Sequence, residues 1–398
     1  MQTIKPRLVR ITTVPVSLRL LLKGQMKYMK EQGFEVIMIS SPGEDAELVE
    51  QQEDCEIITL PMERTVKPLA DLRSLIRLTR ILKNLQPDIV HTHTPKAGLL
   101  GMMAAKIAGV PVRLHTIAGL PWMEAKGISR FILKTMEKLT VALANRVYPN
   151  SKGLYAFLQK EKITRRLDRL KLLGHGSSNG IDCDYFSPEA VKPSEVEAIR
   201  KESGIRNEGW VWIFAGRLVN EKGIHELLTA FQQIHLLYPM DQLWLLGEEE
   251  RKRDPLTQED IQIMERHPAI KRWGFQKDVR PYFAAADVLV FPSYREGLPN
   301  VPLQAGAMGC ALIVTDINGC NEIVTHQENG FLVQPKNEAQ LLDAMQRIRS
   351  NPSLKETFAL NVRNHIRSHY NRNEVWKLIL DEYQYWMRTL QSKGLNRR

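Results

Sequence analysis

Short apolar runs alternate along the chain with longer amphipathic stretches. Apolar runs of this length are typical of strands buried on both faces, and their alternation with helices predicts parallel α/β sheets. In the first half we expect amphipathic helices at Ser17–Gln32 and Asp71–Leu85. The strands expected there are Leu8–Thr12, Glu35–Ser40, Glu56–Leu60, Asp88–His91, Val112–His115, Arg146–Pro149 and, as a further strand, Lys171–Leu173.

The pattern then restarts, after a turn-rich stretch at Gly174–Pro193 that is the candidate linker. A helix is expected at Ile224–His235, between strands at Trp210–Ala215, Gln242–Leu246, Asp287–Phe291 and Ala311–Thr315. This restart predicts two Rossmann-like, doubly wound domains, residues 1–185 and 186–372, whose strand ends face a shared cleft. The last stretch, Asn373–Leu390, has one apolar face, so we expect residues 373–398 to cross back onto the first domain.

Length and composition agree with a two-domain globular protein. The chain has 398 residues, 43% hydrophobic and 25% charged, which is more than one ordinary core accommodates. No stretch approaches the roughly 20 apolar residues that span a bilayer, and the start lacks the pattern of a signal peptide. Four widely spaced cysteines favour a reducing cytosol over a disulfide framework or zinc site: Cys55, Cys183, Cys310 and Cys320.

The positive charge is concentrated in the first half. Residues 1–190 carry 28 Lys and Arg against 19 Asp and Glu, whereas residues 191–398 carry 27 against 26. Four cations recur every fourth residue, at Lys126, Arg130, Lys134 and Lys138, and a second basic run covers Lys160–Lys171. Both favour an anionic membrane surface, although solvated helix faces are the alternative. Nucleic acid is not expected, because no basic groove interleaved with aromatic residues is present.

Two stretches carry candidate chemistry. After the strand ending at Phe291, a short polar turn holds Glu296 just before a helix begins. Helix starts attract anions, so this carboxylate either faces a sugar hydroxyl or is an ordinary helix-entry acid. Earlier, Gly216-Arg217 ends a strand, and Lys222 follows as the next helix starts. These two cations suit a diphosphate, and the alternative is that both are merely exposed.

Together these stretches resemble the family 4 retaining glycosyltransferases, which have the two-domain GT-B fold, and in particular their bacterial capsule and O-antigen branch. The resemblance rests on Gly216-Arg217 with Lys222-Gly223, on Glu296-Gly-Leu-Pro-Asn300, and on Val314-Thr-Asp-Ile-Asn-Gly-Cys-Asn-Glu322. Two phrases of the first half add to it, His91–Gly98 and Ser178–Asp182. It runs over nearly the whole chain in the expected order.

The resemblance implies a role for particular residues. Arg217 and Lys222 would hold the donor diphosphate, and Glu296 would lie beside the donor sugar. Further donor contacts are implied for Gly216, Phe275, Gln276, Leu298, Asn300, Val301 and Gln304. Acceptor contacts are expected in the first domain, from Ser17, His93, Lys96 and His115.

Two positions depart from the family pattern. The signature has a second Glu eight residues after the first, and this chain has Gln304 there, which keeps one acceptor oxygen but no charge. Many relatives have a His near the reaction centre where this chain has Ala118. Other motif-like patterns carry less weight, since Gly174–Gly180 lacks the strand–turn–helix context of a dinucleotide loop and His91 with His93 has no third ligand nearby.

The sequence therefore predicts a cytoplasmic enzyme, peripheral on the inner face of the plasma membrane. It would move a sugar with retention from a nucleotide-diphosphate sugar, expected to be UDP-linked, to a lipid-linked oligosaccharide. No metal or other cofactor is expected, since two cations would offset the diphosphate charge. A non-catalytic nucleotide-sugar-binding subunit and a nucleotide-sugar 2-epimerase are the alternatives.

Overall fold

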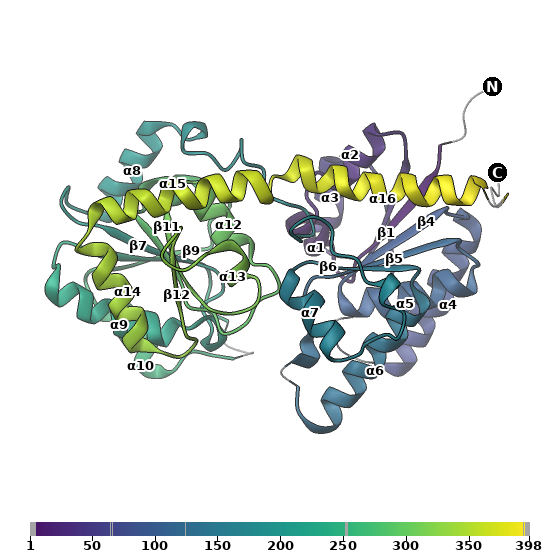
Figure 1. Cartoon of the computed structure of the whole chain (residues 1–398), viewed down its shortest axis with the longest axis horizontal. Coiled ribbons are helices and arrows are strands. Elements are labelled where there is room, and N and C mark those ends of the chain that lie inside the picture. Colours follow the sequence, from purple (N-terminus) through teal and green to yellow (C-terminus); the bar gives the residue numbers. More distant parts are fainter. Residues whose placement is uncertain are drawn as a thin grey trace. The chain divides into compact units, whose positions relative to one another are not determined.

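The chain folds into two compact units in the computed structural model, which describes residues 5–63, 65, 67–123, 125–250, 254–392 and 394. Unit 1 comprises residues 1–180 and 372–398, and unit 2 comprises residues 181–371. Each unit contains one six-stranded parallel sheet flanked by helices (Figure 1). The predicted pair of doubly wound parallel sheets is confirmed.

The sheet of unit 1 has the order β3-β2-β1-β4-β5-β6, so the order reverses between β1 and β4. Its strands are β1 (Arg7–Ile11), β2 (Glu35–Ser40), β3 (Glu56–Thr59), β4 (Ile89–His93), β5 (Val112–Ile117) and β6 (Arg146–Pro149). The further strand expected at Lys171–Leu173 is wrong. Only Leu170 bridges to Val147 of β6, directly after the 3-10 turn η2 (Leu167–Arg169), so the chain does not run along the sheet edge.

The helix expected at Ser17–Gln32 is two helices: the first ends at Leu21, and Gly24, with a left-handed φ of 82°, is the N-cap of the second. The second basic run is not a helix face, since α7 ends at Lys160. The helices of unit 1 are α1 (Pro15–Leu21), α2 (Gln25–Glu31), α3 (Asp45–Glu53), α4 (Pro68–Leu85), α5 (Pro95–Ile107), η1 (Pro121–Met123), α6 (Gly127–Leu143), α7 (Lys152–Lys160) and α16 (Arg372–Ser392).

A fully buried arginine joins α16 to the sheet of unit 1. Arg10 of β1 contacts the hydroxyl of Tyr383 on α16, and its Nη2 donates to Gln25 Oε1 at 2.6 Å. The same guanidinium lies 3.1 Å from His91 Nδ1 and 2.7 Å from His93 Nε2. Burial, then the charge of Arg10, holds the pKa of both imidazoles well below the usual range, so they accept its hydrogen bonds as neutral rings.

The sheet of unit 2 has the order β12-β11-β10-β7-β8-β9. Its strands are β7 (Val211–Ala215), β8 (Gln242–Leu246), β9 (Ile270–Gly274), β10 (Val288–Phe291), β11 (Ala311–Thr315) and β12 (Phe331–Val333). The sequence pattern predicted the four inner strands and missed both edges. β9 includes Lys271 and Arg272 and is only partly buried, and β12 has three residues, so neither forms a continuous apolar run.

The helices of unit 2 lie on both faces of its sheet (Figure 1). They are η3 (Pro188–Ala190), α8 (Pro193–Ser203), η4 (Asn220–Lys222), α9 (Ile224–Leu237), α10 (Gln258–Arg266), α11 (Arg280–Ala285), α12 (Asn300–Ala307), α13 (Cys320–Ile323), α14 (Glu338–Arg349) and α15 (Pro352–His369).

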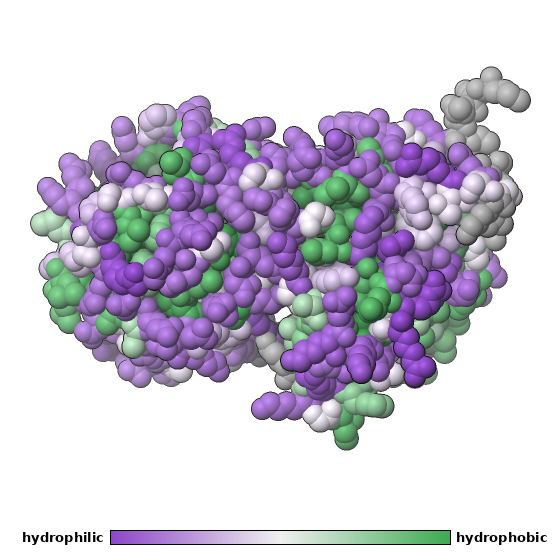
Figure 2. Space-filling model, viewed as in Figure 1, coloured by the Kyte–Doolittle hydropathy of each residue, from purple (hydrophilic) through white to green (hydrophobic). Residues whose placement is uncertain are grey.

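No helix among the described residues is both long and apolar enough to cross a membrane. Polar side chains make up most of the surface of both units in the view of Figure 2. An apolar patch lies at the lower edge of unit 1 in that view, where Figure 1 shows the beginning of α6. Two large apolar side chains of α6 are exposed, Ile128 at 79% and Phe131 at 72%.

Candidate functional site

The strand ends of unit 2 approach one another closely at the carboxyl edge of its sheet. Gly247 follows β8 with a φ of 132°, and a Cβ on it would lie 1.8 Å from the carbonyl oxygen of Gly216, which follows β7. Gly223 precedes α9 with a φ of 68°, and a Cβ there would lie 2.2 Å from the carbonyl oxygen of Pro292 after β10. Glycine at both positions therefore lets the loops after β7, β8 and β10 form one site.

Two of the predicted catalytic residues are in contact in that site. The Lys222 ammonium, at the end of η4, donates to Glu296 Oε1, and the two side chains are only 14% and 16% exposed. Ser293 Oγ also donates to Glu296 Oε1, at 2.9 Å. Asn318 Nδ2 holds the backbone of the same turn, donating to the carbonyls of Glu296 at 3.0 Å and Gly297 at 2.7 Å. Hydrogen bonds thus hold both the carboxylate of Glu296 and the backbone of the turn that carries it.

The third predicted catalytic residue, Arg217, pairs with other carboxylates. It donates to Glu221 Oε1 at 3.0 Å and also contacts Glu250, while 55% of its side chain is exposed. Arg295 donates to the other oxygen of Glu221, with its Nε at 2.9 Å. Burial works to raise the pKa of Glu221, but Arg295 and the other nearby cations bring the net shift downward, so Glu221 stays ionised. Both candidate diphosphate ligands are therefore engaged by carboxylates.

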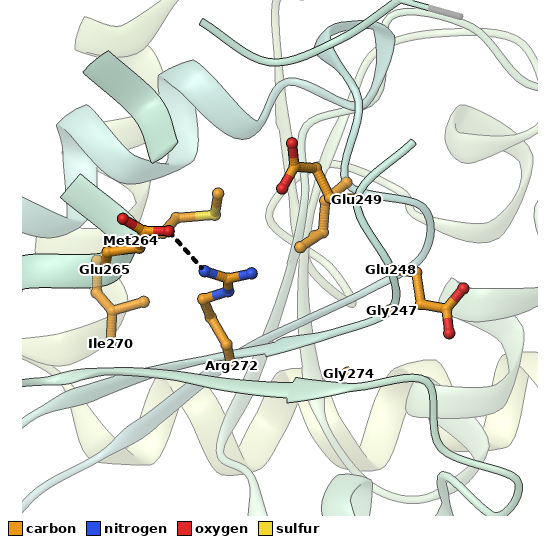
Figure 3. A pocket seen from close by; sticks show the side chains of 9 residues that line it. Gly247, Glu248, Glu249, Met264, Glu265, Ile270, Arg272 and Gly274 are labelled. Carbon is orange, nitrogen blue, oxygen red and sulfur yellow. Dashed lines mark ion pairs between the residues drawn. The ribbon is translucent and has the colours of Figure 1, made fainter. Parts of the chain in front are cut away.

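A cavity of about 520 Å³ lies among the loops after β7 and β8, strand β9 and the end of α10 (Figure 3). Arg272 lies in it with its guanidinium directed at Glu265 of α10, 3.6 Å away. Phe275 and Gln276 follow Gly274 of the cavity wall. Phe275 is 62% exposed, and Gln276 Nε2 donates to the Trp273 carbonyl at 2.6 Å. The cavity is of the size that holds a small organic ligand.

The remaining predicted donor contacts lie where α12 begins. Leu298 is buried in the preceding turn, and Asn300 and Val301 form the first turn of α12, where backbone N–H groups are free of intrahelical partners. Gln304 is half-buried, one turn further along the helix, and its side chain forms no hydrogen bond with the described residues. Its amide is therefore available to a ligand.

Unit 1 contains a second cavity, of about 370 Å³. Two of the predicted acceptor contacts, Ser17 and Lys96, line it, whereas His93 and His115 are buried and are not among its lining residues. Its described lining residues come from the loops after β1 and β4, from the first turns of α1 and α5, from η1 and from α6: Thr13, Val14, Ser17, Thr94, Pro95, Lys96, Pro121, Trp122, Leu133, Met136, Glu137 and Thr140.

Glu137 is a residue of this cavity that the sequence did not reveal. It is only 6% exposed, its Oε1 accepts no hydrogen bond from the described residues, and that atom lies 3.8 Å from His115 Nε2. Burial raises the pKa of Glu137 to about 7 and lowers the pKa of His115 to about 4. The imidazole is thus neutral at physiological pH and offers no ion pair. Nothing in the helical pattern distinguished Glu137 from a solvated acid.

The basic stripe of α6 is partly engaged within unit 1. Arg130 donates to Glu161 Oε1 at 3.1 Å, and Lys134 contacts the other oxygen of Glu161. Both cations also lie 5.5 Å from the centre of the Trp122 ring. Lys126 and Lys138 are exposed and no ion pair of theirs is seen among the described residues, so the stripe supplies fewer available cations than its spacing indicated.

Comparisons with known proteins agree with this fold and site. A Rickettsia africae glycosyltransferase has a TM-score of 0.81 at 19% identity, with 97% of this chain and 99% of that chain covered. The HepE protein of Anabaena, solved with UDP and glucose, has a TM-score of 0.79 at 18% identity, covering 95% and 99%. The two parallel sheets therefore form the GT-B fold.

Family models and curated relatives define the class more closely. Residues 209–351 match the model described as glycosyl transferases group 1, and residues 13–151 match the model described as glycosyl transferase 4-like. The chain belongs to the glycosyltransferase family that these two models describe, and it is an enzyme.

Two relatives illustrate the branch to which it is similar. The capsular polysaccharide biosynthesis glycosyltransferase CapM of Staphylococcus aureus is 28% identical over 97% of this chain and 99% of its own length. A UDP-Gal:α-D-GlcNAc-diphosphoundecaprenol α-1,3-galactosyltransferase of Escherichia coli is 29% identical over 77% and 78%.

The buried Glu137 carboxyl predicts a specific pH dependence of stability. Its pKa is raised from 4.5 to about 7, so stability falls as pH rises through that window, where the unfolded chain ionises and the folded one does not. Between pH 4.5 and 8, the free energy of unfolding of the wild type should fall by about 3 kcal/mol relative to that of Glu137→Gln. Denaturant unfolding at each pH measures the difference. The exposed Glu47→Gln variant should follow the wild type. If the stability of the wild type and of Glu137→Gln changed with pH in parallel, the raised pKa of Glu137 would be contradicted.

Proposed function

We propose that this glycosyltransferase moves a sugar from a UDP-sugar to a lipid-diphosphate-linked saccharide, with retention of configuration at the transferred carbon. The observation that carries the proposal is the contact between Lys222 and Glu296 at one sheet edge. It supplies a cation for a departing diphosphate and a carboxylate for sugar hydroxyls within one site. Similarity to the capsule protein and to an enzyme named for UDP-galactose and a diphosphoundecaprenol acceptor supports the substrate class.

The donor would occupy the carboxyl edge of the sheet of unit 2. The nucleoside fits the cavity beside Phe275 and Gln276, and the diphosphate would take Arg217 and Lys222 from their present carboxylate partners. A diphosphate carries more charge than either carboxylate, and charge builds on it further as the sugar bond breaks. The cations therefore stabilise the transition state more than the bound donor.

Retention needs no separate protein base in this arrangement. A phosphate oxygen of the leaving diphosphate can accept the proton of the attacking acceptor hydroxyl on the face from which it departs. Glu296, held by Ser293 and Asn318, would position the donor sugar by accepting from its hydroxyls. The acceptor sugar would be bound by unit 1, in the cavity lined by Ser17 and Lys96.

Removing either diphosphate cation should reduce turnover far more than donor binding. Arg217→Ala and Lys222→Ala should each lower kcat at least a hundredfold, because one donor to a developing anion contributes about 3 kcal/mol to the transition state. Turnover is measured as the release of UDP from a UDP-sugar in the presence of membrane lipid acceptor. Lys201→Ala, an exposed cation on α8, is the matched control and should be unchanged. Wild-type turnover in both site variants would exclude the diphosphate assignment.

A substitution at Gln304 is expected to strengthen donor binding rather than to impair the enzyme. If its amide oxygen accepts from the ribose, Gln304→Glu should tighten UDP by about 1–2 kcal/mol, roughly tenfold, because a carboxylate accepts two charge-assisted bonds. Isothermal titration of UDP measures the change. Gln233→Glu, on the exposed face of α9, adds the same charge elsewhere and should have no effect. Equal dissociation constants in all three proteins would remove Gln304 from the donor site.

We further propose that the enzyme attaches to the cytoplasmic face of the plasma membrane through α6. Ile128 and Phe131 are the most exposed large apolar residues of that helix, with Lys126 and Lys138 exposed nearby. Insertion of apolar side chains at the interface combined with cation attraction to anionic lipid is the usual means of peripheral binding. This arrangement would bring a lipid-linked acceptor to the cavity on the other side of α6.

Replacing the two apolar side chains tests this attachment. The double variant Ile128→Ser with Phe131→Ser should bind phosphatidylglycerol vesicles at least tenfold more weakly in sedimentation, because full burial of one such side chain contributes about 1.5–3 kcal/mol. The matched control is Leu236→Ser with Leu237→Ser, which are 74% and 58% exposed on α9 of unit 2. A wild type that ignores anionic vesicles at low salt would rule out the attachment.

A further inference from the structure

The cavity of unit 1 has an unusual balance of charge. Only two of its described lining residues are ionisable, Lys96 and Glu137. The Lys96 ammonium is only 7% exposed; it donates to Asp71 Oδ1 at 2.7 Å and also to the Thr65 carbonyl. Its charge is therefore offset by a carboxylate that is not among the lining residues of the cavity.

Among the described residues, in contrast, Glu137 has no charged ion-pair partner. The basic group within ion-pair range of it is His115, at 3.8 Å, which burial keeps neutral. The Trp122 indole N–H, also on the cavity wall, likewise has no hydrogen-bond partner in the part of the chain that the structure describes. Buried polar groups without partners cost stability, so their persistence in one cavity is typical of a binding site.

The rest of the wall indicates the kind of occupant. Apolar side chains of Val14, Leu133 and Met136 alternate with the hydroxyls of Ser17 and Thr140. Such a surface fits a molecule with both CH groups and hydroxyls, and the volume of about 370 Å³ is in the range of small-ligand sites. A second anion beside Glu137 would be repelled strongly, because charges interact over a low dielectric in a buried site.

We propose that Glu137 is a specificity residue for the acceptor: its carboxyl accepts a hydrogen bond from a hydroxyl or amide N–H of an uncharged sugar in this cavity, and it excludes a sugar that carries a carboxylate. The inference rests on the proposed glycosyl transfer and defines the acceptor class. The diphosphate of a lipid-linked acceptor would lie outside this cavity, where the paired Lys96 is not required to hold it.

Binding of simple glycosides to the full chain tests the inference without any turnover. The probes are the methyl α-glycosides of N-acetylglucosamine, glucosamine and glucuronic acid, titrated at pH 8 with saturation-transfer NMR as the readout. The wild type should bind the N-acetylglucosaminide and discriminate against the glucuronide at least tenfold. Glu137→Gln should keep the neutral glycoside but lose that discrimination, and Glu137→Leu should weaken the neutral glycoside at least tenfold. Glu47→Gln should match the wild type.

Several results would overturn the inference. These are equal binding of neutral and acidic glycosides by the wild type, unchanged discrimination in Glu137→Gln, a tenfold preference for the cationic glucosaminide, or binding of no glycoside at all. Should Glu137→Leu fail to fold, the Glu137→Gln result decides alone. UDP titrated into the same samples separates this inference from the proposed function. Intact UDP binding with an unselective cavity contradicts only the role of Glu137, whereas a wild type that does not bind UDP contradicts the proposed function and this inference with it.

Discussion

The parallel direction of the strands is the constraint on which both candidate sites depend. Every ladder in the two six-stranded sheets is parallel, so each strand ends at the same edge as its neighbours. Residues far apart in sequence therefore meet there, as Lys222 and Glu296 do in unit 2. Close approach of the loops at that edge leaves no room for a Cβ at Gly223 or Gly247, so these glycines are part of the site as much as the charged residues are.

The candidate sites of the two units differ in their charged side chains. In unit 2 the cations Arg217 and Lys222 rest on carboxylates that a diphosphate can replace. In unit 1 the cation among the described lining residues of the cavity, Lys96, pairs with Asp71, although the first half of the chain carries most of the net charge. That charge lies on helices and turns instead, as at Lys126 just before α6 and at Lys138 within it. The proposed membrane contact thus uses the basic half of the chain, while the acceptor proposed for its cavity is a neutral sugar.

The sequence predicted the inner strands from local patterns, and the family resemblance assigned Lys222 and Glu296 to one donor site, but neither predicted that the two side chains contact each other. Continuous apolar runs identify buried strands, and short motifs fix the turns that follow them. The edge strands β9 and β12 and the break at Gly24 escaped prediction, since their apolar runs are short or interrupted or the helical pattern continues across the break.

Contacts between distant elements could not be predicted from the sequence, for a different reason. The pairing of Arg130 and Lys134 with Glu161 joins a helix to the end of another, and the approach of Glu137 to His115 joins a helix to a strand. Each depends on how elements pack, which no spacing along the chain encodes. The same holds for Arg10 and Tyr383, which lie at opposite ends of the chain and meet in one buried cluster.

The anomeric configuration of the product tests the central claim most directly. The purified enzyme would be given an α-linked UDP-sugar and a short-chain lipid-diphosphate N-acetylglucosamine, and the coupling constant of the new anomeric proton would be read by NMR. Transfer in which the leaving diphosphate accepts the acceptor proton on its own face predicts an α-linked disaccharide. A β-linked product would contradict it, because inversion requires a base on the opposite face of the sugar.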